Sequence, residues 1–330
     1  MAYPSSPSSP SSASSASFSP PPTAPPDHEL RAQLDVLTTE AFRPELAEID
    51  QRSTLDIARI MNGEDQTVPA AVAAQLPQIA AAIDAIVERM SRGGRLIYAG
   101  AGTAGRMGVL DASECPPTFN TSPTQVLGLI AGGPAAMTEA VEGAEDRAEL
   151  AVEDLTALAP TPDDTVVGIS ASGRTPYAVG AVSHARSLGA LTVGLSCNPG
   201  SALSAAADHR VEVVVGPELL TGSTRLKSGT AQKLVLNMIS TITMIRLGKT
   251  YGNLMVDLRA SNEKLRARSR RIVALATDAS DDEIEAALIA TDGEVKGAIL
   301  TILGKVDGTT AARLLTQSKG HLRAALIAAG

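Results

Sequence analysis

The sequence predicts an α/β fold in which a doubly wound, five-stranded parallel sheet carries helices on both faces. Three observations support this prediction. Five short apolar runs follow one another after residue 90, Ala-rich segments of helical character separate them, and polar turns directly follow three of the runs. Parallel strands buried on both faces have this unbroken apolar character, and helices supply their crossover connections. The predicted strands are Leu96–Tyr98, Gln125–Ile130, Thr165–Ile169, Leu191–Leu195 and Val211–Val215.

The chain begins with a segment, residues 1–27, that consists almost entirely of Ser, Pro and Ala. Such a composition cannot bury a core, so we expect a disordered tail, and it lacks the basic and apolar regions of a secretory signal. Residues 28–85 are predicted to form an N-terminal helical segment. Ser53 suits an N-cap and Pro69 suits a first helical turn. Two helices are expected to begin in this segment: one spans 53–62, and the other spans 69–91 and continues past the end of the segment.

After the fifth strand, one long amphipathic pattern runs from Leu226 to Leu247 and predicts a single helix. From about residue 270 the pattern changes to short helices joined by Asp-Gly turns. We therefore predict a sheet-containing domain over 86–249, a linker over 250–269 and a small helical domain over 270–330. The short helices expected in the last domain are Asp281–Ala290, Val295–Leu303 and Thr309–Thr316.

Overall composition narrows the classes of function. The 330 residues carry a formal net charge of −8, whereas a nucleic-acid-binding surface is usually basic. Aromatic residues make up only 2% of the chain, which disfavours platforms for base or sugar stacking. Two cysteines without CxxC spacing and four scattered histidines predict neither a disulfide framework nor a metal site. No apolar run spans a membrane without charges, so we expect a cytoplasmic protein that binds no nucleic acid, membrane or metal.

A glycine loop is the most informative motif. Gly100, Gly102 and Gly105 follow the first predicted strand and open a helix, where unpaired N–H groups and the positive end of the helix dipole favour a phosphate. The spacing also matches the dinucleotide fingerprint, but no ribose-binding carboxylate stands where the second strand ends, at Leu129–Gly133. The sequence therefore favours a sugar phosphate over NAD, with a tight turn that binds no ligand as the remaining interpretation.

Three hydroxyl side chains follow the third predicted strand. Ser170, Ser172 and Thr175 crowd one strand-to-helix turn, and hydroxyls combined with the N–H groups of a helix start form a cup for phosphate. Simple capping of the helix needs only one of the three. Ser172 stands where a hydrolase nucleophile elbow requires its second glycine, and no Walker A lysine follows a glycine loop.

Two glutamates are candidates for proton transfer. Glu114 lies at a predicted helix end closed by two prolines, and Glu145 ends a helix-like run over Met137–Ala144. Singly, each has the character of a solvated surface acid. Both segments leave the predicted ligand edge, and carboxyls buried near each other have pKa values that diverge, which suits one acid and one base. Contact with an anion and exposure on a solvated or dimer-facing surface both remain open for Arg225, Lys227 and Lys233.

Nine ordered segments carry a resemblance to a known family. They are Leu96–Arg106, Leu110–Thr118, Gly128–Gly133, Val141–Asp146, Ala171–Tyr177, Ser196–Ser201, Leu220–Asn237, Tyr251–Asp257 and Asn262–Leu265. Together they resemble the N-acetylmuramic acid 6-phosphate etherases. The resemblance extends over residues 38–330 and is strongest over 90–265. Motifs of this length and order are far more specific than any single glycine loop.

This resemblance implies a sugar isomerase (SIS) domain over 86–249, a homodimer, a small C-terminal helical domain and no metal or organic cofactor. It implies hydrolysis of N-acetylmuramic acid 6-phosphate to N-acetylglucosamine 6-phosphate and D-lactate in the recycling of cell-wall sugars. By position, the family's catalytic glutamates fall on Glu114, the proton donor, and on Glu145. The residues expected to contact the sugar phosphate are Gly102, Thr103, Ser170, Ser172 and Thr175.

The glycine loop departs from the family pattern, because Ala104 replaces the usual serine and removes a hydroxyl. Losing one such hydrogen bond costs about 1 kcal/mol. Two alternatives to the etherase stay open: a phosphosugar isomerase, which releases no lactate, and a non-catalytic sugar-phosphate sensor. The presence of both glutamates, and of no helix-turn-helix before the sheet, favours the etherase.

The chemistry of ether cleavage requires an acid and a base but no redox centre. Opening of the sugar ring exposes an aldehyde at C1 and acidifies the proton on C2. A base removes that proton, lactate leaves from C3 as an acid protonates the ether oxygen, and water adds to the unsaturated aldehyde. The roles expected from the family are Glu114 as the acid and Glu145 at the C2 proton or the water.

Overall fold

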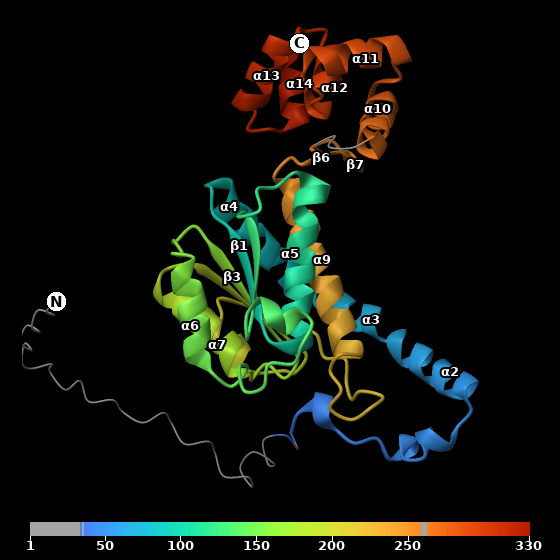
Figure 1. Cartoon of the computed structure of the whole chain (residues 1–330), viewed down its shortest axis with the longest axis vertical. Coiled ribbons are helices and arrows are strands. Elements are labelled where there is room, and N and C mark those ends of the chain that lie inside the picture. The colour runs from blue at the N-terminus through green and yellow to red at the C-terminus, as the bar shows by residue number, and fades with distance from the viewer. Residues whose placement is uncertain (1–33, 35, 259–262) are drawn as a thin grey trace, which may run out of the picture. The chain divides into compact units, whose positions relative to one another are not determined.

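The computed structural model describes residues 34, 36–258 and 263–330, and the predicted tail lies outside them. The predicted five-stranded parallel sheet is confirmed, with the strand order β2-β1-β3-β4-β5 (Figure 1). Its strands are β1 (Leu96–Gly100), β2 (Val126–Ile130), β3 (Thr165–Ser170), β4 (Leu191–Ser196) and β5 (His209–Glu212). The strand order reverses between β1 and β3, and ligands of such sheets bind at the carboxyl ends of the strands beside this switch point.

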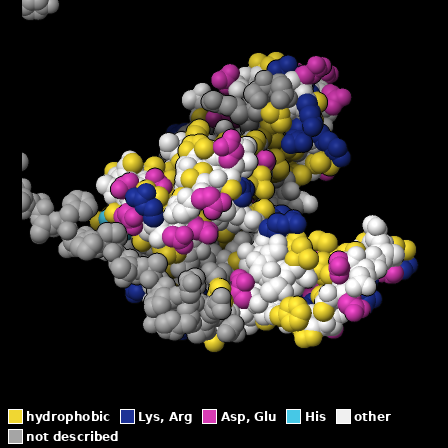
Figure 2. Space-filling model, turned by 60° about the horizontal axis from the view of Figure 1, so that its bottom comes forward, with side chains coloured by type: hydrophobic (Ala, Val, Ile, Leu, Met, Phe, Trp, Pro, Cys, Tyr) yellow, Lys and Arg dark blue, Asp and Glu magenta, His cyan; other side chains and the backbone are white. Residues whose placement is uncertain are grey.

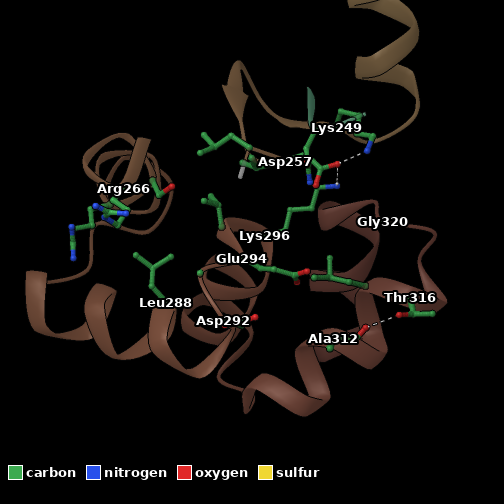
Figure 3. A pocket seen from close by; sticks show the side chains of 18 of the residues that line it. Lys249, Asp257, Arg266, Leu288, Asp292, Glu294, Lys296, Ala312, Thr316 and Gly320 are labelled. Carbon is green, nitrogen blue, oxygen red and sulfur yellow. Dashed lines mark hydrogen bonds and ion pairs between the residues drawn. The ribbon is translucent and has the colours of Figure 1, made fainter. Parts of the chain in front are cut away.

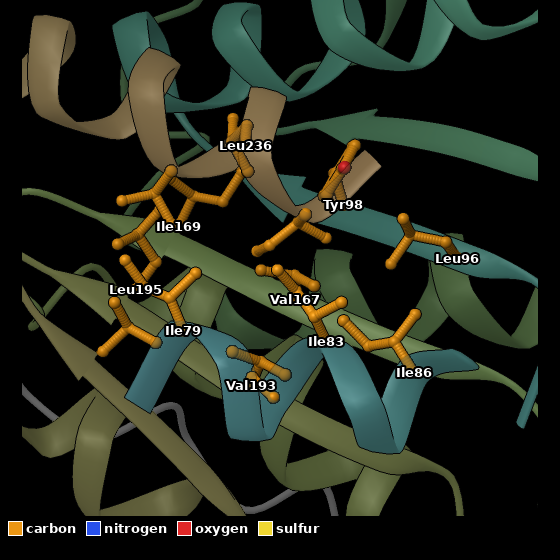
Figure 4. Packing of buried hydrophobic residues seen from close by; sticks show 14 of the residues in the cluster. Ile79, Ile83, Ile86, Leu96, Tyr98, Val167, Ile169, Val193, Leu195 and Leu236 are labelled. Atoms are coloured by element: carbon orange, nitrogen blue, oxygen red, sulfur yellow. The ribbon is translucent and has the colours of Figure 1, made fainter. Parts of the chain in front are cut away.

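Helices cover both faces of the sheet, as predicted. On one face, α4 (Leu76–Ser91), α5 (Gly102–Phe119) and α9 (Lys227–Arg246) pack over an apolar core; in Figure 4 the isoleucines of α4 point at the side chains of β3 and β4. The other face carries α6 (Ala148–Ala157) and α7 (Pro176–Ser187) over a smaller core. Side chains of a strand alternate between faces, so Leu96 and Tyr98 enter the first core while Ile97 and Ala99 enter the second.

Four element predictions are wrong in detail. The strand expected over Val211–Val215 begins two residues earlier, and its pairing with β4 ends at Glu212. Val213 and Val215 follow the paired residues but are also buried, so the apolar run extends beyond the strand. Met137–Ala144 is not helical: a short turn of 3-10 helix, η4 (Pro134–Met137), precedes irregular turns. The helix expected over 69–91 is two helices, α3 (Val68–Ala73) and α4, which begins at Leu76.

The fourth correction concerns the two prolines after Glu114. Pro116 and Pro117 lie inside the last turn of α5, which ends at Asn120 in the left-handed conformation. A proline beyond the first turn removes an N–H donor and crowds the carbonyl group four residues earlier, so α5 continues for only two residues after Pro117. The N–H of Asn120 still donates to the carbonyl oxygen of Pro116 at 2.9 Å. Glu114 is therefore an interior residue of the helix and not its terminus.

Over residues 36–65, the structure describes three short 3-10 turns followed by one helix, α2, which buries none of its residues. The predicted N-cap is confirmed, because the Ser53 side chain accepts a hydrogen bond from the N–H of Asp56.

Among the described residues, no single helix has the length and apolar character needed to cross a bilayer. The bent pair Thr54–Ala73 and Leu76–Ser91 has them only when its two parts are taken together. The short elements are η1 (Thr38–Glu40), η2 (Pro44–Leu46), η3 (Ile49–Gln51), α2 (Thr54–Asp65) and α8 (Ala202–Ala206).

Helices after residue 262 form an apolar core of their own. The three helices predicted there are present, each within one residue of its expected bounds. Two others were not predicted, and the expected linker 250–269 contains a small antiparallel hairpin and the start of a helix. The elements are β6 (Thr250–Tyr251), β7 (Leu254–Met255), α10 (Glu263–Thr277), α11 (Asp281–Ala290), α12 (Val295–Gly304), α13 (Gly308–Gln317) and α14 (Leu322–Ala329).

Candidate active site

Glycines allow α5 to start directly against the end of β1. A Cβ at Gly100 would lie 2.9 Å from the carbonyl oxygen of Ile169, and one at Gly105 would lie 2.7 Å from that of Gly100. Gly102, the first residue of α5, has φ +51°, which favours glycine. No side chain caps this helix start. Its N–H groups are therefore available to an anion, as the glycine loop predicted.

The next two residues of the loop face the body of the protein. Thr103 lies close to the start of α9, because a Cβ at Gly229 would approach the Thr103 Cγ2 to 3.3 Å. Ala104, where the family pattern has serine, is 8% exposed and belongs to the main apolar core. The side chain at position 104 therefore packs into the core in this protein.

The three predicted hydroxyl residues lie together beyond β3. The Ser170 Oγ is 2.8 Å from the Thr175 Oγ1 and 3.3 Å from the Ser172 Oγ. Ser170 also accepts a hydrogen bond from the N–H of Gly173. Thr175 is the N-cap residue of α7, yet its side chain makes no capping hydrogen bond. Capping of α7 by Thr175 is therefore not the explanation of this cluster, which lies one strand away from the glycine loop.

Glu145 borders a cavity of about 170 Å³ beside the glycine loop. Gly102 and Arg106 line the cavity from α5, and Glu139 and Glu142 line it with Glu145 from the segment after β2. Although much of the Glu145 side chain is exposed, burial raises the pKa of its carboxyl, and the nearby carboxylates of Asp146 and Glu142 raise it further. The Glu145 carboxyl therefore keeps its proton to a higher pH than an ordinary glutamate.

Within a single chain, Glu114 lies outside the cavity that contains Glu145. It is exposed on α5, twelve residues after Gly102, and it does not line the cavity that contains Glu145. At 1.5 Å per residue, the helix places it about 18 Å along the axis from the glycine loop. The fold therefore brings six of the seven predicted site residues to one edge of the sheet and leaves Glu114 on the flank of α5.

Asn198, which the sequence did not single out, ties the N-terminal segment to the ligand edge. Its side chain is 2% exposed, and its Oδ1 accepts hydrogen bonds from the N–H and the Oγ1 of Thr38, both at 2.8 Å. Its Nδ2 donates to the Oγ1 of Thr39 and to the carbonyl oxygen of Ala171, both at 3.0 Å. Ala171 belongs to the turn that carries the hydroxyl cluster, so Asn198 supports that turn.

Charged residues at the start of α9 have structural partners. The fully buried Glu218 accepts hydrogen bonds from the N–H groups of Lys227 and Ser228, and so caps α9. The Lys227 ammonium is 2.7 Å from Glu64, which also pairs with Arg43. Burial opposes ionisation of Glu64, but hydrogen bonds from Lys227 and Arg43 hold its pKa below the ordinary value. Lys227 is therefore neither the anion contact nor the surface cation that the sequence left open.

A larger cavity of about 1050 Å³ lies between the ends of α5 and α9 and the C-terminal helices (Figure 3). Two of its lysines, Lys249 and Lys296, pair with the same carboxylate, Asp257, at 2.8 and 3.1 Å. Neither predicted glutamate lines this cavity. Over residues 36–258 and 263–330, no group of three or more His, Cys, Asp or Glu side chains is arranged to hold a metal ion.

Comparison with known proteins places this arrangement in a class. Residues 78–186 match the model of the glucokinase regulatory protein N-terminal SIS domain, and residues 145–242 match that of the SIS domain. A phosphoheptose isomerase from Francisella tularensis superposes on 59% of this chain and all of its own, with 21% identity and a TM-score of 0.48. The sheet order and the family models define a protein with a SIS domain.

Full-length relatives identify the family within that class. The N-acetylmuramic acid 6-phosphate etherase of Streptomyces coelicolor is 79% identical over 93% of this chain and 99% of its own, and that of Streptomyces avermitilis is 79% identical over 91% and 96%. The etherase of Escherichia coli strain ED1a is 55% identical over 89% and 99%. The chain belongs to the N-acetylmuramic acid 6-phosphate etherase family, which confirms the resemblance read from the sequence.

Proposed function

We propose that this protein hydrolyses the lactyl ether of N-acetylmuramic acid 6-phosphate, giving N-acetylglucosamine 6-phosphate and D-lactate in the recycling of cell-wall sugars. Identities of 55–79% to relatives that bear the name of this activity carry the proposal. The glycine loop and the hydroxyl cluster at one sheet edge support it, because both suit a phosphate group. These relatives do not favour an isomerase or a sensor.

In the proposed reaction, the phosphate binds to Gly102, Thr103 and the cluster of Ser170, Ser172 and Thr175. Glu145 takes the C2 proton of the ring-opened sugar, and the electron pair of the C2–H bond forms a double bond to C3. The C3–O bond breaks, and Glu114 gives its proton to the departing lactate oxygen. Water then adds its hydroxyl at C3 and a proton at C2, which makes the overall reaction a hydrolysis.

The distance along α5 has a consequence for how the site is completed. A sugar phosphate held at the glycine loop is too short to reach a carboxyl about 18 Å away along the same helix. We infer that Glu114 serves the site of a second copy of the chain, while Glu145 serves the site of its own chain. A homodimer, which the family resemblance implied, then contains two composite sites.

Exposed apolar side chains support such a dimer. Leu110 lies one helical turn before Glu114 on α5 and is 48% exposed. Leu55 on α2 is 58% exposed, and Phe42 in the preceding segment is 65% exposed. In Figure 2, apolar side chains are visible on the arm at the lower right that contains α2. Water-exposed apolar surface of this kind is typical of a protein interface.

Lactate release from purified protein and N-acetylmuramic acid 6-phosphate tests the proposed activity. We expect D-lactate and N-acetylglucosamine 6-phosphate in equal amounts, and turnover in D₂O is expected to place deuterium at C2 of the product. Glu114→Gln is expected to abolish lactate release while substrate still binds. Product with only protium at C2 contradicts elimination and re-addition, and full activity of the variant removes Glu114 from the chemistry.

Mixed dimers test whether two chains complete one site. Glu114→Gln and Glu145→Gln chains, each inactive alone, are unfolded and refolded together. With composite sites, half of the dimers are mixed and one of their two sites is intact, so about one quarter of the wild-type activity returns. With both glutamates acting from one chain, every site of the mixture lacks one acid and no activity returns.

A further inference from the structure

The cavity beside Glu145 is rich in negative charge. Among the described residues that line it, three side chains are carboxylates (Glu139, Glu142 and Glu145) and one is a cation, Arg106. On the proposed function, the substrate adds a lactyl carboxylate next to the ether bond that is cleaved. An anionic group enters such a cavity only with a partner of opposite charge, because like charges at short range repel each other.

Arg106 is held firmly in place at this cavity. Its Nε donates to the carbonyl oxygen of Met137 at 3.1 Å, and its Nη2 donates to that of Glu139 at 3.2 Å. These contacts use two of the five N–H groups of a guanidinium and fix the plane of the group. Within residues 36–258 and 263–330, no carboxylate lies within ion-pair distance of Arg106, in spite of the three in the same cavity.

A guanidinium that is oriented by carbonyl groups and has no anionic partner is suited to a carboxylate ligand, which it binds with two parallel hydrogen bonds. We propose that Arg106 binds the lactyl carboxylate of the substrate and thereby selects muramyl sugars over other sugar phosphates. This inference rests on the proposed function. It gives Arg106 a role in specificity, beside the anchoring of the segment that carries the three glutamates.

A neutral analogue of the substrate isolates this contact. We compare N-acetylmuramic acid 6-phosphate with its lactyl amide, which has the same shape, the same phosphate and the same ether but no carboxylate charge. Wild-type protein is expected to cleave the acid with a kcat/KM on the order of 10²-fold above that of the amide, because the charged hydrogen bonds are missing from the amide. Equal kcat/KM values for acid and amide overturn the inference.

Arg106→Gln removes the charge and retains an N–H donor for the carbonyl groups of the segment. We expect its kcat/KM to fall on the order of 10²-fold on the acid and less than about 3-fold on the amide, so that the preference disappears. An equal fall on both substrates means that Arg106 only supports the segment, which overturns the inference. The wild-type comparison of the two substrates decides the question if the variant does not fold.

Arg147→Gln is the matched control. It makes the same change of charge two residues after Glu145, at an exposed side chain that pairs with Glu149 and does not line the cavity. The preference for the acid is expected to remain as in the wild type. A loss of preference equal to that of Arg106→Gln shows a general effect of charge and overturns the inference. Failure of the wild type to cleave the acid at all refutes the proposed function itself.

Discussion

At the scale of single residues, two side chains hold the loops of the candidate site through backbone carbonyl groups. Arg106 donates to the segment after β2, and Asn198 donates to the turn after β3. Ser170, Ser172 and Thr175 were predicted as a cluster because they share one turn after a buried strand. Arg106 and Asn198 carry no such pattern, because their partners are backbone groups or residues far along the chain. Side chains that act through carbonyl groups leave no signature in local residue types.

The raised pKa of Glu145 predicts a pH effect of its neighbour Glu142. The Glu142 carboxylate raises the pKa of Glu145, so Glu142→Gln is expected to lower it. The acid limb of the pH profile of kcat/KM then moves to lower pH, because Glu145 ionises more readily. Glu149→Gln, at an exposed residue beyond the cavity, is the control. A limb that stays in place, or moves to higher pH, contradicts the role of Glu145 as a base.

The hydroxyl cluster predicts a binding defect for Ser170→Ala. Loss of the hydroxyl removes the proposed contact to the phosphate and the acceptor for the N–H of Gly173, so KM is expected to rise about tenfold while kcat changes little. The control is Ser187→Ala at the far end of α7, where the hydroxyl donates to the carbonyl oxygen of His184. Steady-state kinetics of lactate release measure both. An unchanged KM would remove the cluster from substrate binding.

At the scale of elements, the strands were predictable and several boundaries were not. Continuous apolar runs placed β1 to β4, because a strand buried on both faces consists mainly of apolar residues. The run Val211–Val215 placed the fifth strand two residues too late, because the buried apolar residues continue beyond the part of β5 that pairs with β4. Helix α10 was missed in part because the charged residues of Glu263–Thr277 hide its periodicity. Placing Glu114 within its helix required the length of α5. The sequence did not predict that length, because Pro116 and Pro117 suggested an earlier end of the helix.

The ion pair between α2 and α9 predicts a pH-dependent contribution to stability. Glu64→Gln leaves the buried Lys227 without its carboxylate, and we expect a loss of about 1–3 kcal/mol in the free energy of unfolding at pH 7. The pKa of Glu64 is lowered on folding, so its contribution is complete above the ordinary value of 4.5 and is lost as the pH falls through the lowered pKa.

Denaturant unfolding of wild type and variant at several pH values measures this difference. The two curves are expected to approach each other below pH 4.5 and to meet once the pH is below the lowered pKa of Glu64, because protonated Glu64 resembles glutamine. Glu88→Gln serves as the control, because Glu88 forms an exposed pair with Arg92. A stability difference that persists at low pH would show that the glutamine acts through packing and not through charge.

At the scale of the whole molecule, one exposed flank of α5 is central to the proposal. Leu110 and Glu114 share that flank, so the proposed dimer contact and the proposed second acid belong to one surface. Leu110→Glu places a charge in this contact and is expected to yield a monomer of 33.8 kDa that releases no lactate. Light scattering with a lactate assay measures both properties. The matched control is Leu188→Glu, at a 40% exposed residue that follows α7 on the other face of the sheet. An active monomer would refute the composite site.

The tie between Thr38 and Asn198 has a consequence for the order of events during synthesis. The two residues are 160 positions apart in the chain, and a ribosome adds about 5–20 residues per second. Thr38 therefore leaves the ribosome roughly 8–32 s before its partner is made. The edge proposed to receive the phosphate is completed only when Asn198, two residues after β4, has been translated, so a nascent chain acquires this edge late.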